Sequence, residues 1–337
     1  MEHPIRIGLF GVGHLGKIHL RLLKSLPQFE VVGFYDINPG LSEKVAAEFG
    51  VVAYSDPEAL MAGIEAASIV TPTLAHFALA SRALERGLHV FIEKPITHTL
   101  EEALALDRLY QERPGCVAQV GHVERFNPAF RALDGKELAP LFIEGHRLAF
   151  YNPRGTDVSV VHDLMIHDLD IVLSMVRSPL RQVHASGVAV ISETPDIANA
   201  RLEFENGCVA NLTASRISVK NMRRLRFFQK NAYVSVDFLE KKTEIIRLAD
   251  ADAPDLPESK MAWDNGEKKQ FVVFEQPAIE ESNAIQSELA EFAASIRAGA
   301  RVRVSLNDGM QALRLANAIR DEIERHAQRV KELDPNL

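Results

Sequence analysis

The spacing of apolar residues changes character about a third of the way along the 337-residue chain. Before residue 120, short apolar runs alternate with segments whose apolar residues recur every three or four positions, which predicts strands alternating with amphipathic helices. The expected strands cover residues 5–10, 30–36, 51–54, 66–71, 88–93 and 116–121. The expected helices cover residues 15–26, 41–49, 74–86 and 100–111, with Ser42, Thr73 and Thr99 as helix-start residues. This order predicts a doubly wound parallel sheet.

After residue 140 the pattern becomes one of long stretches in which apolar and polar residues alternate. Such stretches at 201–205, 208–213 and 232–238 predict an antiparallel sheet. Helices are expected over 162–177, 281–298 and 306–329, and the Asp- and Pro-rich stretch 249–260 is expected to be an exposed loop. We therefore predict an α/β chain of two domains, residues 1–122 and residues 123–337, whose last helix can pack back on the first domain.

Composition narrows the class of protein. The chain is 47% hydrophobic and 25% charged, as is usual for a globular protein, and its net charge of −8 disfavours nucleic acid as a partner. The start of the chain lacks the basic and apolar regions of a leader, and no apolar run has membrane-spanning length, so we expect a cytoplasmic protein with no membrane partner. Cys116 and Cys208 lie far apart, so we expect buried thiols and no metal site.

A glycine-rich turn follows the first expected strand. In Gly11-x-Gly13-x-x-Gly16, the first glycine allows a tight turn, the second lets a pyrophosphate approach the backbone, and the third lets the helix pack on the strand. Asp36 ends the second strand 20 residues after Gly16, where a carboxylate binds a ribose diol and repels a 2′-phosphate. Residues 37–39 offer no basic group, so NAD is favoured over NADP. The alternative is that Asp36 only forms the turn before residues 38–40.

Two charged or polar motifs follow later strands of the same sheet. Thr71-Pro72-Thr73-x-x-His76 comes after the fourth strand, and Glu93-Lys94-Pro95 comes after the fifth. Ligands of open α/β sheets bind at the carboxyl ends of the strands, so Lys94 is expected to reach a bound ligand. The alternative is a solvated loop lysine.

The helix expected over 162–177 carries a carboxylate and an imidazole on one face. Asp163 and His167 are four residues apart, which lets the acid support proton transfer by the imidazole. His162 and His167 are five apart and diverge around the helix, which disfavours a shared metal ion. A second alternative is structural, with Asp163 capping the helix and His167 buried between the domains.

Together these motifs resemble the glucose-fructose oxidoreductase/inositol dehydrogenase (Gfo/Idh/MocA) family, and the resemblance covers essentially the whole chain. It implies a Rossmann domain followed by an α/β domain with a large, mostly antiparallel sheet, through which homodimers or homotetramers form. His167 would be the acid/base, Lys94 would polarise the reacting oxygen, and Asp163 would orient the pair. The NAD contacts would come from Gly11, Gly13, His14, Leu15, Gly16, Asp36, Thr71, Pro72, Thr73, His76, Glu93 and Lys94.

Basic residues after the sixth strand bear on the substrate. The string GHVERFNP and the helix DLMIHDLDIVL are similar to the branch of the family that oxidises UDP-N-acetylglucosamine at position 3, a reaction that leads to 3-amino sugars of lipid A, lipopolysaccharide or related glycans. We expect His146 to join the basic cluster that holds the diphosphate. The expected substrate contacts are His122, Arg125, Asn127, Arg147, Arg154 and His167.

Two other hypotheses stay open at this point. The arginines can be ordinary surface charge, in which case the substrate is an uncharged sugar or polyol such as myo-inositol. The chain can also be a non-catalytic NAD-binding regulator, because one fold hosts several functions. Retention of Lys94, Asp163 and His167 argues against a regulator, which needs no proton-transfer set.

Overall fold

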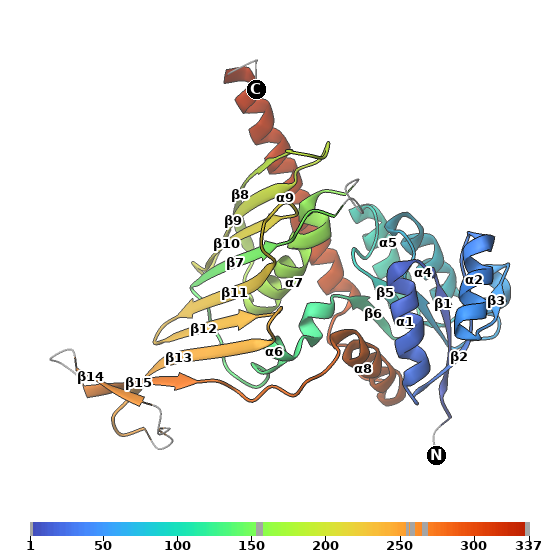
Figure 1. The fold of residues 1–337 in the computed structure, drawn as a ribbon, viewed down its shortest axis with the longest axis horizontal. Coiled ribbons are helices and arrows are strands. Elements are labelled where there is room, and N and C mark those ends of the chain that lie inside the picture. Colours follow the sequence, from blue (N-terminus) through green and yellow to red (C-terminus); the bar gives the residue numbers. More distant parts are fainter. Residues whose placement is uncertain (1–2, 153–157, 254–255, 257–259, 265–268, 334–337) are drawn as a thin grey trace. The chain divides into compact units, whose positions relative to one another are not determined.

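The apolar runs of the first third form a six-stranded parallel sheet in a computed structural model, which describes residues 3–152, 158–253, 256, 260–264 and 269–333. The strand order is β3-β2-β1-β4-β5-β6, as expected for a Rossmann domain (Figure 1). The strands are β1 (Ile5–Phe10), β2 (Phe29–Tyr35), β3 (Ala53–Tyr54), β4 (Ala66–Ile69), β5 (His89–Glu93) and β6 (Ala118–Gly121). The predicted doubly wound sheet is confirmed.

Helices cover both faces of this sheet. They are α1 (His14–Ser25), α2 (Pro39–Phe49), α3 (Pro57–Met61), α4 (His76–Glu85) and α5 (Leu100–Gln111), together with α8 (Ala284–Ala298) from much later in the chain. Leu23 of α1 and Phe292 of α8 bury against Phe91 of β5 on one face. Leu79 of α4 and Ile92 of β5 belong to the core on the opposite face. Strands buried on both faces explain the continuous apolar runs in the sequence.

The predicted helix starts were partly right. Thr99 caps α5 with a full capping box, and Thr73 opens a short 3₁₀ turn (Thr73–Ala75) before α4. The prediction that Ser42 starts a helix was wrong, because Ser42 lies buried inside α2. That helix begins at Pro39, and the side chain of Asn38 accepts a hydrogen bond from the Leu41 amide at 3.1 Å. Asn followed by Pro supplies a cap and a residue suited to the first helical position.

The second sheet has nine strands in the order β14-β15-β13-β12-β11-β7-β10-β9-β8, and all its described pairs are antiparallel except β7 with β10. This confirms the mostly antiparallel sheet implied by the resemblance. The strands are β7 (Phe142–Leu148), β8 (Leu180–Val188), β9 (Ile197–Phe204), β10 (Val209–Ser215), β11 (Met222–Gln229), β12 (Ala232–Asp237), β13 (Lys242–Asp250), β14 (Lys260–Asp264) and β15 (Lys269–Glu275).

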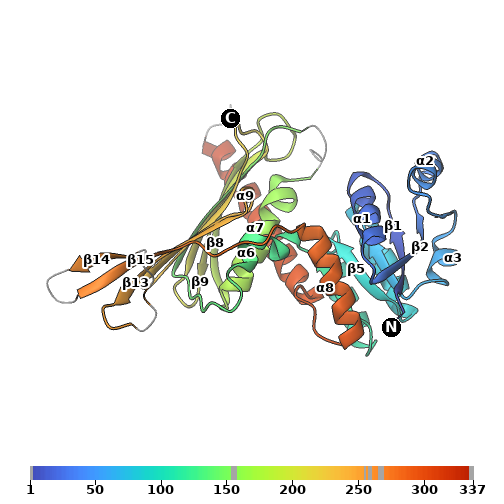
Figure 2. The same ribbon diagram turned by 60° about the horizontal axis from the view of Figure 1, so that its bottom comes forward.

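One face of the nine-stranded sheet is covered by helices. Figures 1 and 2 show α7 (Ile166–Met175) and α9 (Leu306–Leu333) on the same side of it. On β9, Ala198, Ala200 and Leu202 are buried toward that side, while the intervening residues stay partly or fully exposed. Period-two alternation therefore reports a sheet with one covered face.

The helix predicted over 162–177 is irregular at its start. Val161–Met165 form a π-helical turn, after which α7 continues as a regular α-helix. Single π turns are rare and occur frequently at functional sites. The loop predicted over 249–260 is shorter than expected, because β13 continues to Asp250 and β14 begins at Lys260; residues 254–255 and 257–259 lie outside the described part of the chain.

The chain divides into two units, each built around one of the sheets. The first contains Met1–Phe126 and Ser282–Leu313, and the second contains Asn127–Glu281 and Arg314–Leu337. Across the described residues, no helix is both long and apolar enough to span a membrane. Cys116 and Cys208 are free thiols, and burial raises the pKa of Cys208 to about 11.

Candidate cofactor and catalytic site

The glycine turn of the first unit is shaped for a bound anion. A Cβ atom on Gly16 would lie 2.1 Å from the carbonyl oxygen of Gly11, and a Cβ on Gly11, whose φ is +90°, would lie 2.7 Å from the carbonyl oxygen of Val70. Gly13 differs from both, because a Cβ there would meet nothing within 4 Å. Gly13 is also the N-cap of α1 and provides no capping side chain. The start of α1 therefore has no capping side chain and has open space at Gly13, which leaves room for a phosphate at the helix N-terminus.

Asp36 is tied to this turn. One carboxylate oxygen accepts a hydrogen bond from the Val12 amide at 2.8 Å, and the other accepts one from the Asn38 amide at 2.9 Å. The hydrogen bond from Asn38 forms the turn that the alternative interpretation predicts. The hydrogen bond from Val12 places the carboxylate against the glycine motif. Each carboxylate oxygen can accept a further hydrogen bond, so Asp36 has both the place and the capacity to bind a ribose hydroxyl.

Thr71 lies against the same turn. Its main-chain nitrogen would be 2.9 Å from a Cβ atom on Gly11, and its buried hydroxyl has no hydrogen-bond partner among the described residues. An orphaned buried hydroxyl beside an open helix start is what a missing polar ligand leaves. In the first turn of α1, His14 is exposed and Leu15 is half-buried. Together, the residues at this edge of the sheet fit a dinucleotide.

His76 has a different environment from the one predicted. It is 1% exposed, and its two ring nitrogens lie 2.8 Å from the carbonyl oxygen of Pro95 and 2.9 Å from that of Thr71. The pKa of His76 is lowered by burial, and its hydrogen bonds to Thr71 and Pro95 and the charge of Glu93 offset only part of this effect. With both nitrogens turned to main-chain oxygens, the ring faces the protein.

Glu93 forms a buried cluster beneath Lys94. Its carboxylate lies 3.1 Å from Nε2 of His19, which is fully buried on α1, and accepts a hydrogen bond from the Lys94 amide at 3.2 Å. A Cβ on Gly121 would lie 2.9 Å from this carboxyl group, so the glycine makes room for it. His19 was not among the predicted site residues, although its position beside Leu20 on the buried stripe of α1 was a signal.

The predicted substrate-binding residues after β6 are buried or already bonded to other parts of the protein. His122 is 1% exposed, and Arg125 lies 3.7 Å from Asp308. In the second unit, Asn127 caps the short helix α6 (Pro128–Arg131) and donates from its side-chain amide to the carbonyl oxygen of Phe238 at 3.0 Å. These contacts fix the segment that follows β6.

Arg147 forms a buried ion pair. It is 2% exposed, and its guanidinium donates to Asp168 on α7 at 2.7 to 3.1 Å. His146 is the next-door residue on β7 and therefore projects to the opposite face of the sheet, so the two do not form one basic cluster. Arg154 lies outside the described residues.

Asp163 borders a cavity of about 400 Å³ within the second unit. The lining residues are Ala149, Phe150, Tyr151, Asn152, Asp163, Leu164, Arg216 and Asn221. The Ser159 hydroxyl accepts a hydrogen bond from the Val161 amide, and Asp163 lies inside the π turn, so the alternative that Asp163 caps this helix was wrong. His167, one helical turn later, is half-buried. His162 instead contacts Asn317 at 2.8 Å.

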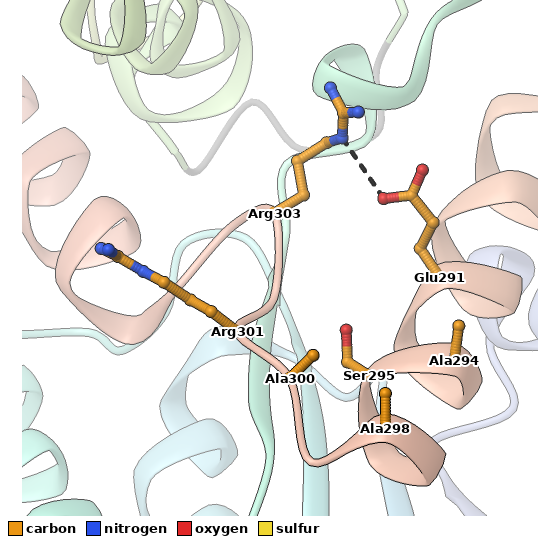
Figure 3. Close-up of a pocket in the computed structure, with 7 residues that line it drawn as sticks. All are labelled: Glu291, Ala294, Ser295, Ala298, Ala300, Arg301 and Arg303. Carbon is orange, nitrogen blue, oxygen red and sulfur yellow. Dashed lines mark hydrogen bonds and ion pairs between the residues drawn. The ribbon is translucent and has the colours of Figure 1, made fainter.

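Figure 3 shows another hollow, at the end of α8 in the first unit. Arg303 and Glu291 form an ion pair at 3.3 Å across it, and Arg301 points away from them. None of the predicted site residues lines this hollow. Among the residues that the structure describes, no group of three or more His, Cys, Asp or Glu is placed to hold a metal ion.

Comparison with known proteins matches two segments of the chain to one family. Residues 5–122 match the model of the Gfo/Idh/MocA oxidoreductase family, NAD-binding Rossmann fold, and residues 136–234 match a C-terminal domain of the same family. UDP-N-acetylglucosamine 3-dehydrogenase of Acidithiobacillus ferrooxidans is 41% identical over 254 residues, which are 75% of this chain and 80% of that protein. The scyllo-inositol 2-dehydrogenase (NAD(+)) of Bacillus subtilis is 33% identical over 239 residues, 65% of this chain and 69% of the relative.

Solved structures agree with these matches. A structure of the Acidithiobacillus ferrooxidans enzyme superimposes with a TM-score of 0.84 and 36% identity, covering 95% of this chain and 98% of that one. A levoglucosan dehydrogenase in complex with NADH and L-sorbose has a TM-score of 0.79 at 20% identity, over 96% and 98% of the two chains, and supports the fold alone.

Proposed function

The chain belongs to the Gfo/Idh/MocA family of NAD-dependent oxidoreductases, and from this premise we propose that it oxidises the 3-hydroxyl group of UDP-N-acetylglucosamine, or of a close UDP-N-acetyl sugar, to the ketone. The observation that carries the proposal is the 41% identity to a UDP-N-acetylglucosamine 3-dehydrogenase over three quarters of the chain. The ketone product is suited to transamination, so the proposed role is supply of 3-amino sugars for lipid A, lipopolysaccharide or related glycans.

The proposed chemistry assigns one task to each of three side chains. His167 takes the proton from the sugar hydroxyl, Lys94 donates a hydrogen bond to the same oxygen as negative charge develops, and Asp163 orients the imidazole. NAD, when bound, supplies the acceptor for the hydride that leaves the carbon. Support comes from the position of Lys94 at the carboxyl end of β5 and of Asp163 at the cavity of the second unit.

The cavity beside Asp163 supports a bulky substrate. Phe150 and Tyr151 are 56% and 45% exposed, and aromatic rings of this kind stack on the faces of flat polar groups such as a nucleobase. Asn221 already accepts a hydrogen bond from the Phe150 amide, which fixes this rim. We assign Arg125 and Arg154 to the diphosphate; Arg147 is a weaker candidate, since Asp168 occupies its guanidinium.

The alternative substrate is an inositol or another free polyol. Its support is the 33% identity to a scyllo-inositol 2-dehydrogenase. A binding experiment distinguishes the two substrate hypotheses. In the presence of NADH, UDP-N-acetylglucosamine should raise the melting temperature of the protein, because a ligand that binds only the folded state stabilises it. Stabilisation by scyllo-inositol or myo-inositol, with none by the UDP sugar, would refute the proposed substrate.

We further propose that the chain forms a homo-oligomer through the face of the nine-stranded sheet that the helices leave open. Five apolar side chains form a cross-strand row on this face: Phe142, Phe228, Tyr233, Ile246 and Phe274. Phe228 and Phe274 are 37% and 48% exposed. The next row carries both signs of charge, including the 2.9 Å ion pair of Arg226 with Glu144, and a second copy related by a two-fold axis offers the same mixture.

A further inference from the structure

His76 joins two loops that carry the predicted cofactor and catalytic motifs. His76 is the first residue of α4 and is 1% exposed. Its Nδ1 contacts the carbonyl oxygen of Pro95, and its Nε2 contacts the carbonyl oxygen of Thr71. Thr71 follows β4 and lies against the glycine turn, whereas Pro95 follows directly after Lys94. One buried ring therefore contacts both loops within the first unit.

The ring supplies a link where the sheet itself has none. Strands β4 and β5 are paired as far as Ile69 and Ile92, and beyond these residues the ladder of main-chain hydrogen bonds stops. Thr71 and Pro95 are two and three residues further on. A rigid ring that has a nitrogen at each of two edges can contact two such loops and keep them at a fixed separation.

The chemistry of the contacts limits what the ring can do. A carbonyl oxygen only accepts hydrogen bonds, so each contact is favourable only if the ring nitrogen carries a proton. The neutral ring donates from one nitrogen, and the protonated ring donates from both. The net effect is a lowered pKa of His76, because burial opposes protonation more strongly than the hydrogen bonds to Thr71 and Pro95 and the charged side chain of Glu93 favour it. In neither form is a nitrogen left to bind a ligand.

We propose that His76 is a positioning residue that sets the distance between the cofactor-binding turn at Thr71 and the loop that carries Lys94. The Nε2 contact holds the turn that faces the dinucleotide, and the Nδ1 contact holds the main chain next to Lys94. The two contacts thus act on different steps, cofactor binding and chemistry. The effect on chemistry rests on the role proposed above for Lys94, whereas the effect on cofactor binding does not.

Two substitutions separate the contacts. His76→Asn keeps an amide near the position of Nδ1 and loses the Thr71 contact, so the Kd for NADH should rise about tenfold, the usual effect of one lost hydrogen bond, with a smaller change in kcat. His76→Gln keeps an amide near Nε2 and loses the Pro95 contact, so kcat should fall about tenfold with little change in the Kd for NADH. His98→Asn, at an exposed histidine of the same unit, is the matched control.

The Kd for NADH is measured by binding alone, so it tests the proposal even if the assumed sugar substrate is wrong. Equal losses of both quantities in the two variants, or no loss in either, would overturn the proposal. If the variants do not fold, ¹⁵N NMR spectra of the His76 imidazole in the wild-type protein test the proposal instead. The proposal predicts that a ring nitrogen is hydrogen-bonded to a main-chain oxygen both with and without NADH, and a ring without such a hydrogen bond would refute it.

Discussion

At the scale of single residues, His167 carries the most direct prediction. If it is the proton acceptor, His167→Ala should lower turnover by about 100-fold or more, the usual contribution of a general base, and leave the Kd for NADH unchanged. The control is His326→Ala, at an exposed histidine of α9. Steady-state rates and NADH titration measure the two effects. Wild-type turnover in His167→Ala would remove the residue from the mechanism.

Asp36 carries the prediction about cofactor choice. Asp36→Asn keeps one oxygen that can accept the Val12 amide but loses the negative charge that repels a 2′-phosphate. The preference for NAD over NADP, measured as a ratio of kcat/KM values, should fall about tenfold or more. Glu30→Gln removes a charge from an exposed position on the same strand and should leave the ratio unchanged. An unaltered ratio in Asp36→Asn would contradict the assignment to the ribose.

Residue types alone did not reveal which polar side chains would be bonded to other parts of the protein and which would be left to bind a ligand. Asp36 could be placed from its spacing, because the strand-turn-helix unit has a fixed geometry. Arg147 could not, since its partner Asp168 lies 21 residues away on another element and no local pattern links them. His76 was predicted at the cofactor for the same reason: the sequence contains the imidazole but not the two main-chain oxygens that occupy it.

At the scale of elements, the glycine turn allows a matched pair of substitutions. Gly13→Ala places a methyl group where the protein has open space, so the melting temperature should stay close to that of the wild type while the Kd for NADH rises. Gly16→Ala places it 2.1 Å from the Gly11 carbonyl oxygen, and overpacking of this kind costs about 1–3 kcal/mol of unfolding free energy. Chemical denaturation and NADH titration measure both effects. A cofactor-binding defect limited to Gly16→Ala would contradict the proposed path of the pyrophosphate.

Most elements of the first unit followed from local pattern, and the irregular ones did not. The helix Leu100–Gln111 begins at the predicted residue because the capping box of Thr99 is a local signal. The π turn over Val161–Met165 has no comparable signature, since a helix-period sequence is compatible with either winding. Sheet order and the parallel pairing of β7 with β10 depend on contacts between distant segments, which periodicity does not encode.

At the scale of the whole molecule, the cross-strand row of apolar side chains predicts an oligomer that one substitution can dissociate. Phe228→Asp puts a charge among the apolar residues of the row and should convert the oligomer to a smaller species, as measured by light scattering after gel filtration. Val219→Asp changes an apolar residue that is 87% exposed outside the row, and should leave the mass unchanged. A wild-type protein that is monomeric, or a Phe228→Asp protein of unchanged mass, would contradict the proposed interface.

The central claim concerns the substrate, and formation of NADH tests it most directly. The protein is mixed with NAD and UDP-N-acetylglucosamine, beside parallel reactions with UDP-glucose, glucose and myo-inositol. A coupled aminotransferase or another trap for the ketone prevents stalling, because oxidation of an alcohol by NAD is thermodynamically uphill. We predict NADH absorbance with the UDP-N-acetyl sugar and none with the free sugar or polyol. NADH formed only with myo-inositol or glucose would contradict the account, leaving the family assignment in place without its substrate.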